Sequence, residues 1–407
     1  MVDQAAADVE PAPAFPLPLE PDGFGSSPRE HERRRGQCPV GLVTMPSGDP
    51  AHLVVRYDDV AQLLRDRRVS RNLRYPGAPR MVREADPSDN PHALVNHDPP
   101  EHTRFRQVIQ GVFSPSQQPA WTPMVRRIVG ELLDRIEAQG PPADLVRDFA
   151  TVLPIRVVCE MMDVPAEDHQ RFANWTGVFF AVDPATDEAR LAAGHEFLAY
   201  LVAMIEQRRA EPRDGVVDLL IRARDADDRL SEPELIQMIA ALFIGGQENM
   251  ASFLARGVFT LLRHRDQFDA LREDPALVDG AVEEILRFDI PSEGAFLRVA
   301  TEDLELGGGA IPKGRAVQVS LASANRDESH FADPHRFDIR REPNAHLSFG
   351  LGAHFCPGAP LARLELRTAI SMVAERFPKL ELGIAPQEAR FAEGSLIHPL
   401  LTLPVTW

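Results

Sequence analysis

The stretch that decides the fold is Phe349–Gly358, FGLGAHFCPG, which surrounds one of only three cysteines with glycines, two phenylalanines and a proline. A helix-like run, APLARLELRTAIS, follows it directly. Glycines let a backbone approach a flat group closely, and a helix N-terminus stabilises a thiolate. The pattern therefore predicts that Cys356 is an anionic sulfur ligand. A cysteine standing alone would instead be interpreted as a small buried hydrophobe.

The whole chain has the composition of a globular protein, with 407 residues, 44% hydrophobic and 26% charged. Its formal net charge of −17 argues against nonspecific binding to nucleic acid or anionic membranes. No apolar run reaches the roughly 18 residues of a membrane helix, and the first thirty residues lack a secretory pattern. We therefore expect a cytoplasmic protein. Cys38 and Cys159 form no motif, so both are predicted to be inert.

The chain divides into a lead-in and a larger remainder. Residues 1–36 are proline-rich and then charged, which predicts an extended, mobile segment, and 37–407 is predicted to be a single catalytic domain. Apolar residues recur at three- and four-residue spacing through the middle of the chain, which indicates helices. Strand-like runs at 295–300, 304–306 and 316–323 come late. The fold class is mainly α with a small β region.

The longest predicted helix begins at Ser231, which forms an S-x-x-E capping box with Glu234. It continues to Arg263, a length of about 45 Å at 1.5 Å per residue. Gly245 and Gly246 interrupt its apolar centre at a cost of about 1 kcal/mol each relative to alanine. We therefore expect that something requires bare backbone there.

The cysteine stretch fits F-x-x-G-x-H/R-x-C-x-G, and with it the chain resembles the haem-thiolate monooxygenases, the cytochrome P-450 family, in its soluble bacterial type. The resemblance implies a triangular prism of helices, with haem b (iron protoporphyrin IX) between a long central helix and the helix after the cysteine loop. It implies that Cys356 is the iron ligand. It also places around the haem the residues Phe349, Gly350, His354 and Gly358.

Other family motifs occur in the expected order. Glu284 and Arg287 fit E-x-x-R, whose structural role in the family is to hold the cysteine loop with a further arginine, here Arg336 or Arg340. Taken alone, the pair would be an i,i+3 surface ion pair worth a few tenths of a kcal/mol.

A set of four cationic or histidine side chains matches the family's haem propionate donors. Such donors suit two carboxylates. Each residue alone would be interpreted as a solvated charge or a satisfied core histidine. The set is His102, Arg106, Arg298 and His354.

The glycine pair opens the sequence GGQEN, where the family has A/G-G-x-D/E-T and bends the helix over the haem. The catalytic candidates are Glu248, as a proton relay, and Asn249, which stands in place of threonine. Asparagine offers two donors and one acceptor but no readily ionised proton. Two interpretations stay open: simple oxygen insertion, or an atypical oxidation such as coupling or ring formation.

The resemblance also implies a largely apolar substrate pocket, lined by Leu94, Phe179, Phe180, Ala241, Ile244, Gly245, Gly294, Ala295, Phe296, Leu396 and Ile397. It implies O2 as co-substrate and a medium-sized apolar small molecule, in secondary-metabolite tailoring. Electrons would come from a ferredoxin and an NAD(P)H-linked ferredoxin reductase. Docking candidates are Arg65, Arg67, Arg68, Arg104 and Arg363. A haem-based gas sensor and a peroxide-driven enzyme are the rival classes.

Overall fold

The computed structural model describes residues 12–83, 86–179, 187–226, 229–393 and 397–407. Within them the chain is mainly helical with small sheets, as the sequence predicts. The helices are α1 Pro28–Gln37, α2 Tyr57–Arg65, α3 Glu101–Val112, α4 Gln118–Gln139, α5 Val152–Met161, α6 His169–Phe179, α7 Asp187–Ala210, α8 Val216–Asp225, α9 Glu232–Gly245, α10 Glu248–Arg263, α11 Arg265–Glu273, α12 Val278–Phe288, α13 Leu321–Ala324 and α14 Ala359–Arg376.

The strands are β1 Val40–Thr44, β2 Pro50–Val54, β3 Val69–Ser70, β4 Ala143–Asp144, β5 Arg298–Ala300, β6 Leu304–Leu306, β7 Gly309–Ile311, β8 Ala316–Val319, β9 Glu381–Leu382 and β10 Pro404–Thr406. Among the described residues the largest sheet has the order β1-β2-β8-β5-β3, in which only β2 and β8 are parallel. This sheet joins strands from residues 40–70 with strands from residues 298–319, so its formation requires contacts between distant segments.

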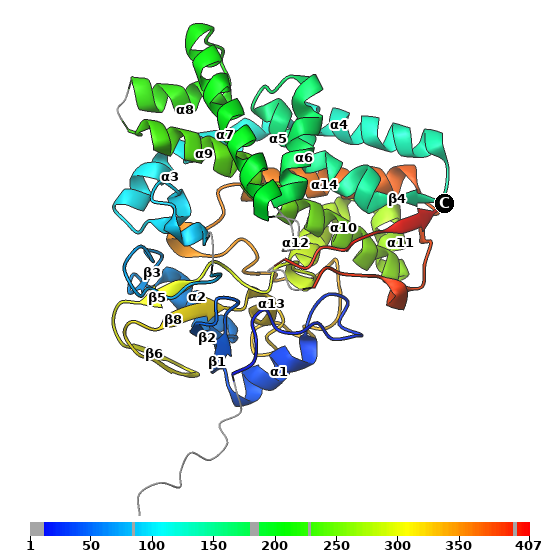
Figure 1. The fold of residues 1–407 in the computed structure, drawn as a ribbon. Helices are drawn as coiled ribbons and strands as arrows, with labels where there is room; N and C mark the ends of the chain where they lie inside the picture. Colours follow the sequence, from blue (N-terminus) through cyan, green and yellow to red (C-terminus); the bar gives the residue numbers. More distant parts are fainter. Residues whose placement is uncertain (1–11, 84–85, 180–186, 227–228, 394–396) are drawn as a thin grey trace, which may run out of the picture.

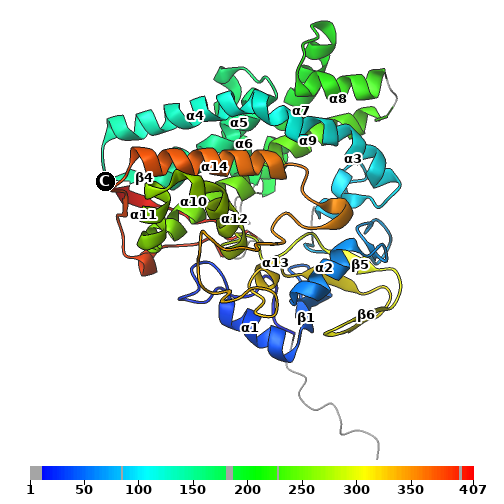
Figure 2. The same cartoon turned by 180° about the vertical axis from the view of Figure 1, so that it is seen from behind.

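Most of the long helices and the large sheet occupy different parts of the molecule. Figures 1 and 2 show α4, α5 and α7–α9 in the upper part, and the sheet with α1 and α2 in the lower part. α14 packs against α4, α10 and α12. Most buried apolar side chains belong to one core that spans these helices. None of the helices in the described part of the chain is long and apolar enough to cross a membrane.

The predicted long helix is present but broken. Ser231 caps α9, where its side chain accepts from the Glu234 amide and its own amide donates to the Glu234 carboxylate at 2.7 Å, which confirms the capping box. The helix ends at Gly245 and resumes at Glu248, so a single helix to Arg263 is wrong. Two consecutive glycines weaken helical backbone where the interruption falls.

The predicted lead-in also differs, because residues 28–37 form α1 rather than an extended run. Pro28 in the first turn favours a helix start. Three of its charged or polar side chains, His31, Arg34 and Arg35, are buried with partners; Arg35 donates to Ser323 Oγ at 3.1 Å and to Glu328 at 2.9 Å. This charged run therefore forms a packed helix, because hydrogen-bond acceptors in other segments bind its buried side chains. That 37–407 is a single catalytic domain stays a prediction.

Candidate active site

The cysteine loop is held by glycines and by the end of α2. Gly350 and Gly352 have φ of +70° and +73°, which side chains rarely adopt. A Cβ on Gly352 would lie 2.4 Å from the Leu64 carbonyl oxygen, so only glycine fits there. The Cys356 amide donates to the Phe349 carbonyl at 2.8 Å and folds the loop back on itself. Cys356 lies two residues before Gly358, which is the N-cap of α14.

The surroundings of Cys356 favour a thiolate only in part. Burial raises the pKa of its thiol, whereas the backbone amides of Gly358 and Ala359 and the guanidinium of Arg106 lower it. Helix N-terminal amides and a nearby cation are the features that suit an anionic sulfur. The loop is therefore built for a sulfur ligand rather than for an inert core cysteine. By contrast, burial raises the pKa of Cys159 to about 12.

The E-x-x-R pair is fully buried and clamps the segment before the cysteine loop. Arg287 donates from Nε and Nη2 to the two Glu284 carboxylate oxygens at 2.8 Å, and from Nη1 to the Asn325 and Pro334 carbonyls. The third member is Arg341, whose Nε lies 3.2 Å from both Glu284 oxygens. The prediction of Arg336 or Arg340 is wrong: Arg336 contributes its carbonyl oxygen instead.

The four predicted propionate donors share one neighbourhood. The rings of His102 and His354 lie 4.3 Å apart between centroids. Burial and, after it, the nearby positive charges of His102, Arg298, Arg71 and Arg106 together lower the pKa of His354 to about 2. Burial also lowers the pKa of Arg298 to about 10. The structure thus concentrates positive charge here.

Little carboxylate is available to balance this cluster. Asp98 acts electrostatically on His102 and Arg298. Its oxygens, however, already accept bonds from the Ser70 hydroxyl and, at 2.9 Å, from the Arg71 amide. Buried charge of one sign is costly unless it is paired. The cluster therefore fits a group that brings two carboxylates, such as the propionates of haem.

Arg71 is a site residue that sequence reasoning missed. Its guanidinium is buried and donates to the Val95 and Leu297 carbonyls and to Asn96 Oδ1, and it lies 5.0 Å from the ring centre of Phe296. It ties the predicted pocket segments around 94–96 and 296–297 to each other. No sequence signal separates it from the chain's many other arginines.

The broken helix presents a small, partly polar face. Ala241, Gly245 and Asn249 are exposed and recur every four residues, while Leu242 and Phe243 beside them are buried. Gly246 is also exposed, and a side chain on Gly245 would meet no atom within 4 Å. This face consequently borders open space. Burial raises the pKa of the half-buried Glu248 in the same break.

The predicted pocket residues have mixed surroundings. Phe296 is 49% exposed, whereas Leu94, Ile244, Gly294, Ala295 and Ile397 are partly buried. Phe179 ends α6, but its side chain, Phe180 and Leu396 lie outside the described residues. Trp175 and Thr176, earlier in the same aromatic run, are buried, so they belong to the core.

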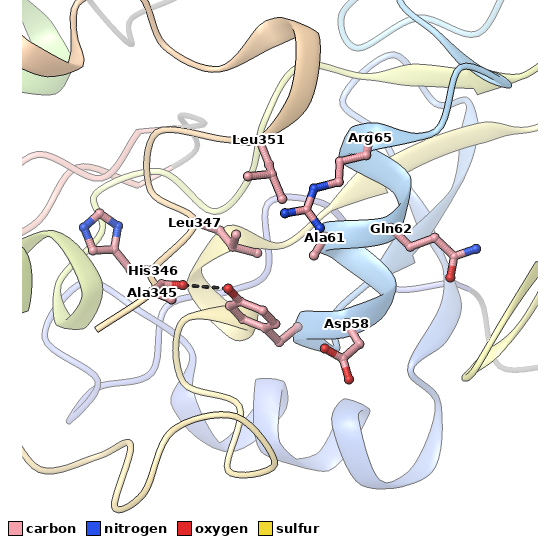
Figure 3. A pocket seen from close by; sticks show the side chains of 9 residues that line it. Asp58, Ala61, Gln62, Arg65, Ala345, His346, Leu347 and Leu351 are labelled. Carbon is pink, nitrogen blue, oxygen red and sulfur yellow. Dashed lines mark hydrogen bonds between the residues drawn. The ribbon is translucent and has the colours of Figure 1, made fainter. Parts of the chain in front are cut away.

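A separate pocket of about 430 Å³ lies between α2 and residues 345–351, which lead into the cysteine loop (Figure 3). Its lining includes Arg65 on one side and Ala345, Leu347 and Leu351 on the other. The Tyr57 hydroxyl donates to the Ala345 carbonyl at 2.6 Å and closes one end. None of the predicted substrate residues lines it.

The arginines predicted for partner docking differ in availability. Arg65 and Arg67 are exposed, and Arg68 pairs with Asp66 beside it. Arg363 donates twice to Glu283, and Arg104 binds Glu234 of the α9 cap with Nη2 at 2.7 Å. The Arg104 pair lowers the pKa of Glu234 to about 2. Arg104 thus anchors α3 to α9.

A cysteine on a glycine loop before a helix, a buried cation cluster and a helix broken at a glycine pair together define a haem-thiolate protein. The cytochrome P450 family model matches residues 155–389. The chain is 41% identical to nocardicin C N-oxygenase of Nocardia uniformis subsp. tsuyamanensis, over 92% of this chain and 94% of that protein. It is 40% identical to mycinamicin IV hydroxylase/epoxidase of Micromonospora griseorubida, over 91% and 92%.

Solved structures agree with this likeness. The LnmA cytochrome P450 hydroxylase from the leinamycin pathway of Streptomyces atroolivaceus has a TM-score of 0.89 and 39% identity, over 97% of this chain and 100% of that one. The chain therefore belongs to the cytochrome P450 family, and it is a monooxygenase with haem b as its cofactor. The fold predicted from the resemblance is confirmed.

Proposed function

We propose that this enzyme inserts one atom of O2 into a medium-sized, largely apolar natural product. The observation that carries the proposal is the small face of the broken helix, with Ala241, Gly245 and Asn249 exposed beside the half-buried acid Glu248. An open face of small side chains with one acid beside it suits substrate binding and proton supply. The names of the relatives, an N-oxygenase and a hydroxylase/epoxidase of natural products, support this substrate class.

The site residues have two proposed roles: some would bind the cofactor and one would supply protons. Cys356 would ligate the haem iron, and His102, Arg106, Arg298 and His354 would bind its propionates. When bound, haem supplies the oxygen chemistry, which a thiolate ligand promotes by donating electron density. Because burial raises the pKa of Glu248, this side chain keeps a proton at a pH where an exposed glutamate has lost it. Such an acid suits a relay.

Asn249 supports a second candidate function. An amide can bridge two partners with fixed geometry, but it does not pass on its own proton. Protons would then travel through water or a substrate group, and the same scaffold would perform an atypical oxidation such as coupling or ring formation. Asn249 is exposed on the open face, so it is available to a substrate.

The electron donor we propose is a small ferredoxin, reduced by an NAD(P)H-linked reductase. Arg65 and Arg67 are the strongest docking candidates because both are exposed and Arg65 lines the pocket beside the cysteine-loop segment. Arg68 and Arg363 remain candidates with intramolecular partners. Arg104 is a weaker candidate, because Glu234 holds its guanidinium.

The test is a titration of the haem-loaded enzyme with a panel of apolar natural products, in which binding shifts the haem from low to high spin. Compounds that bind are then incubated with ferredoxin, reductase, NADPH and isotopically labelled O2. Gain of one labelled oxygen atom by the product supports insertion. Loss of two hydrogens without gain of oxygen supports the second candidate, and turnover with peroxide alone would contradict the ferredoxin route.

A further inference from the structure

The N-terminal helix contains a buried imidazole bound to a buried carboxylate. His31 on α1 is 2% exposed and Glu293, in the loop after α12, is 4% exposed. His31 Nε2 lies 2.7 Å from Glu293 Oε1, and the Ser320 hydroxyl donates to the same oxygen at 2.9 Å. The carboxylate therefore joins three segments: α1, the loop after α12 and the end of β8.

Glu293 directly precedes the predicted pocket segment 294–296. Gly294 bridges to Ser320, and a Cβ on it would lie 2.2 Å from the Val319 carbonyl oxygen, so its backbone lies flat against β8. Gln318 Nε2 donates to the Ala295 carbonyl at 2.7 Å. The next residue, Phe296, carries the exposed ring of this wall. One side of the segment is thus fixed by β8, and the Glu293 carboxylate fixes its beginning.

A second contact ties the same N-terminal segment to the other loop of the predicted pocket. The fully buried Arg256 donates to the Phe24 carbonyl at 3.3 Å and to the His398 carbonyl at 2.8 Å. The His398 amide in turn donates to the Pro291 carbonyl at 2.8 Å. The loop at 291–293 and the loop at 397–398 are therefore braced together, with residues 24–31 behind them.

We propose that His31 is a positioning residue that sets the pocket wall 294–296 through Glu293. The inference rests on the proposed placement of the substrate pocket. Loss of the imidazole would leave a buried carboxylate with one hydrogen bond fewer, and the loop would relax toward other partners. A displacement of about 1 Å in a positioning element changes the fit of a bound molecule strongly. The N-terminal helix thereby takes part in substrate selection without touching substrate.

Two azoles that ligate the haem iron test this role in the intact holoenzyme. Ketoconazole is bulky enough to reach the proposed pocket wall, whereas imidazole would occupy only the space next to the iron. We expect His31→Ala to weaken ketoconazole binding on the order of tenfold and to leave imidazole binding unchanged. His31→Gln should restore much of the loss, because its amide nitrogen can replace the imidazole Nε2–H.

A double-mutant cycle and a matched control decide the cause. If His31 acts through Glu293, the double variant His31→Ala, Glu293→Ala should bind ketoconazole no more weakly than Glu293→Ala alone. Arg35→Gln removes another contact of α1, to Ser323 and Glu328. It should leave the ratio of the ketoconazole Kd to the imidazole Kd at the parental value. The proposal is overturned if His31→Ala leaves this Kd ratio unchanged, or if the losses of ketoconazole affinity in His31→Ala and Glu293→Ala add up in the double variant. It is also overturned if Arg35→Gln loses as much ketoconazole affinity as His31→Ala. A parent that binds imidazole but not ketoconazole overturns the pocket placement instead.

Discussion

Asn249 is the residue at which this chain departs from its family motif, and it lies on the exposed face of the broken helix. If its amide holds a substrate group or an ordered water, both Asn249→Thr and Asn249→Ala should divert electrons from product to hydrogen peroxide. A hydroxyl donates and accepts at one atom, so it cannot reproduce the spacing between the separate N–H and C=O groups of the amide. The measurement is product formed per NADPH consumed, with peroxide quantified alongside. Equal coupling in the three proteins would show that position 249 has not been specialised.

Cys356 carries the second prediction at this scale. Cys356→His should abolish the thiolate signature in the absorption spectrum of the reduced, carbon monoxide-treated enzyme, because imidazole donates less electron density than thiolate. Cys38→Ser and Cys159→Ser serve as controls and should keep the parental spectrum. Persistence of the signature in Cys356→His would remove Cys356 from the iron.

Glu365 on α14 predicts a pH dependence of stability. It is buried, its Oε2 has no hydrogen-bond partner within the described part of the chain, and burial raises its pKa to about 8. The unfolded chain loses this proton near the ordinary value of 4.5, while the folded chain keeps it to about pH 8. The folded state therefore binds more protons in this window, and stability falls as pH rises through it.

Glu365→Gln should remove that fall, because glutamine stays neutral. Relative to the parent, the variant should gain on the order of a few kcal/mol of unfolding free energy between about pH 5 and about pH 8. Denaturant melts at the two pH values measure it, with Glu375→Gln, on the same helix, as the control. Parallel pH profiles for parent and Glu365→Gln would contradict the prediction.

Among the elements, α12 and the segment 336–344 depend on one buried carboxylate. Arg341→Ala should cost about 3 kcal/mol or more and reduce haem retention, because it removes a partner from the buried Glu284. The side chain of Arg336 is 66% exposed against 10% for Arg341, so Arg336→Ala should change stability by less than about 0.5 kcal/mol. Denaturant unfolding and the haem absorbance per chain report both effects. A larger loss of stability in Arg336→Ala than in Arg341→Ala would contradict this prediction and favour Arg336 as the partner of Glu284.

The same elements show what sequence can and cannot predict. The capping box and the cysteine loop are local patterns, so they were predictable and the structure has them. The glycine pair indicated a need for bare backbone, but the end of the helix at Gly245 was not predicted. Arg336, Arg340 and Arg341 lie too close in sequence for spacing to choose between them. Which of the three arginines reaches Glu284 depends on the path that residues 336–341 take along α12. Arg71 and α1 were missed for the same reason: their partners lie in distant segments.

At the scale of the whole molecule, a net charge of −17 makes the exposed arginines near the cysteine loop important for partner encounter. Arg65→Glu and Arg67→Glu should slow reduction by an acidic ferredoxin on the order of tenfold at low ionic strength. The difference should shrink as salt screens the charges. Stopped-flow reduction over a salt series measures this. Arg135→Glu on α4 is the control, since it changes net charge equally at an exposed position, and an equal slowing in it would indicate a net-charge effect alone.

The bracing of residues 24–31 by Arg256, Glu293 and the 397–398 loop has a consequence for how the chain is made. The bracing of residues 24–31 is completed only when residue 398 has been added, a long interval after their own synthesis. At about 5–20 residues per second, that interval is roughly twenty seconds or longer. Phe15 and Leu17, by contrast, share a core cluster with Val43, Met45 and Leu53, which follow closely in the sequence, so part of their core is made early. The contacts that hold residues 24–31 against the loops at 291–293 and 397–398 are therefore among the last to form as the chain is made.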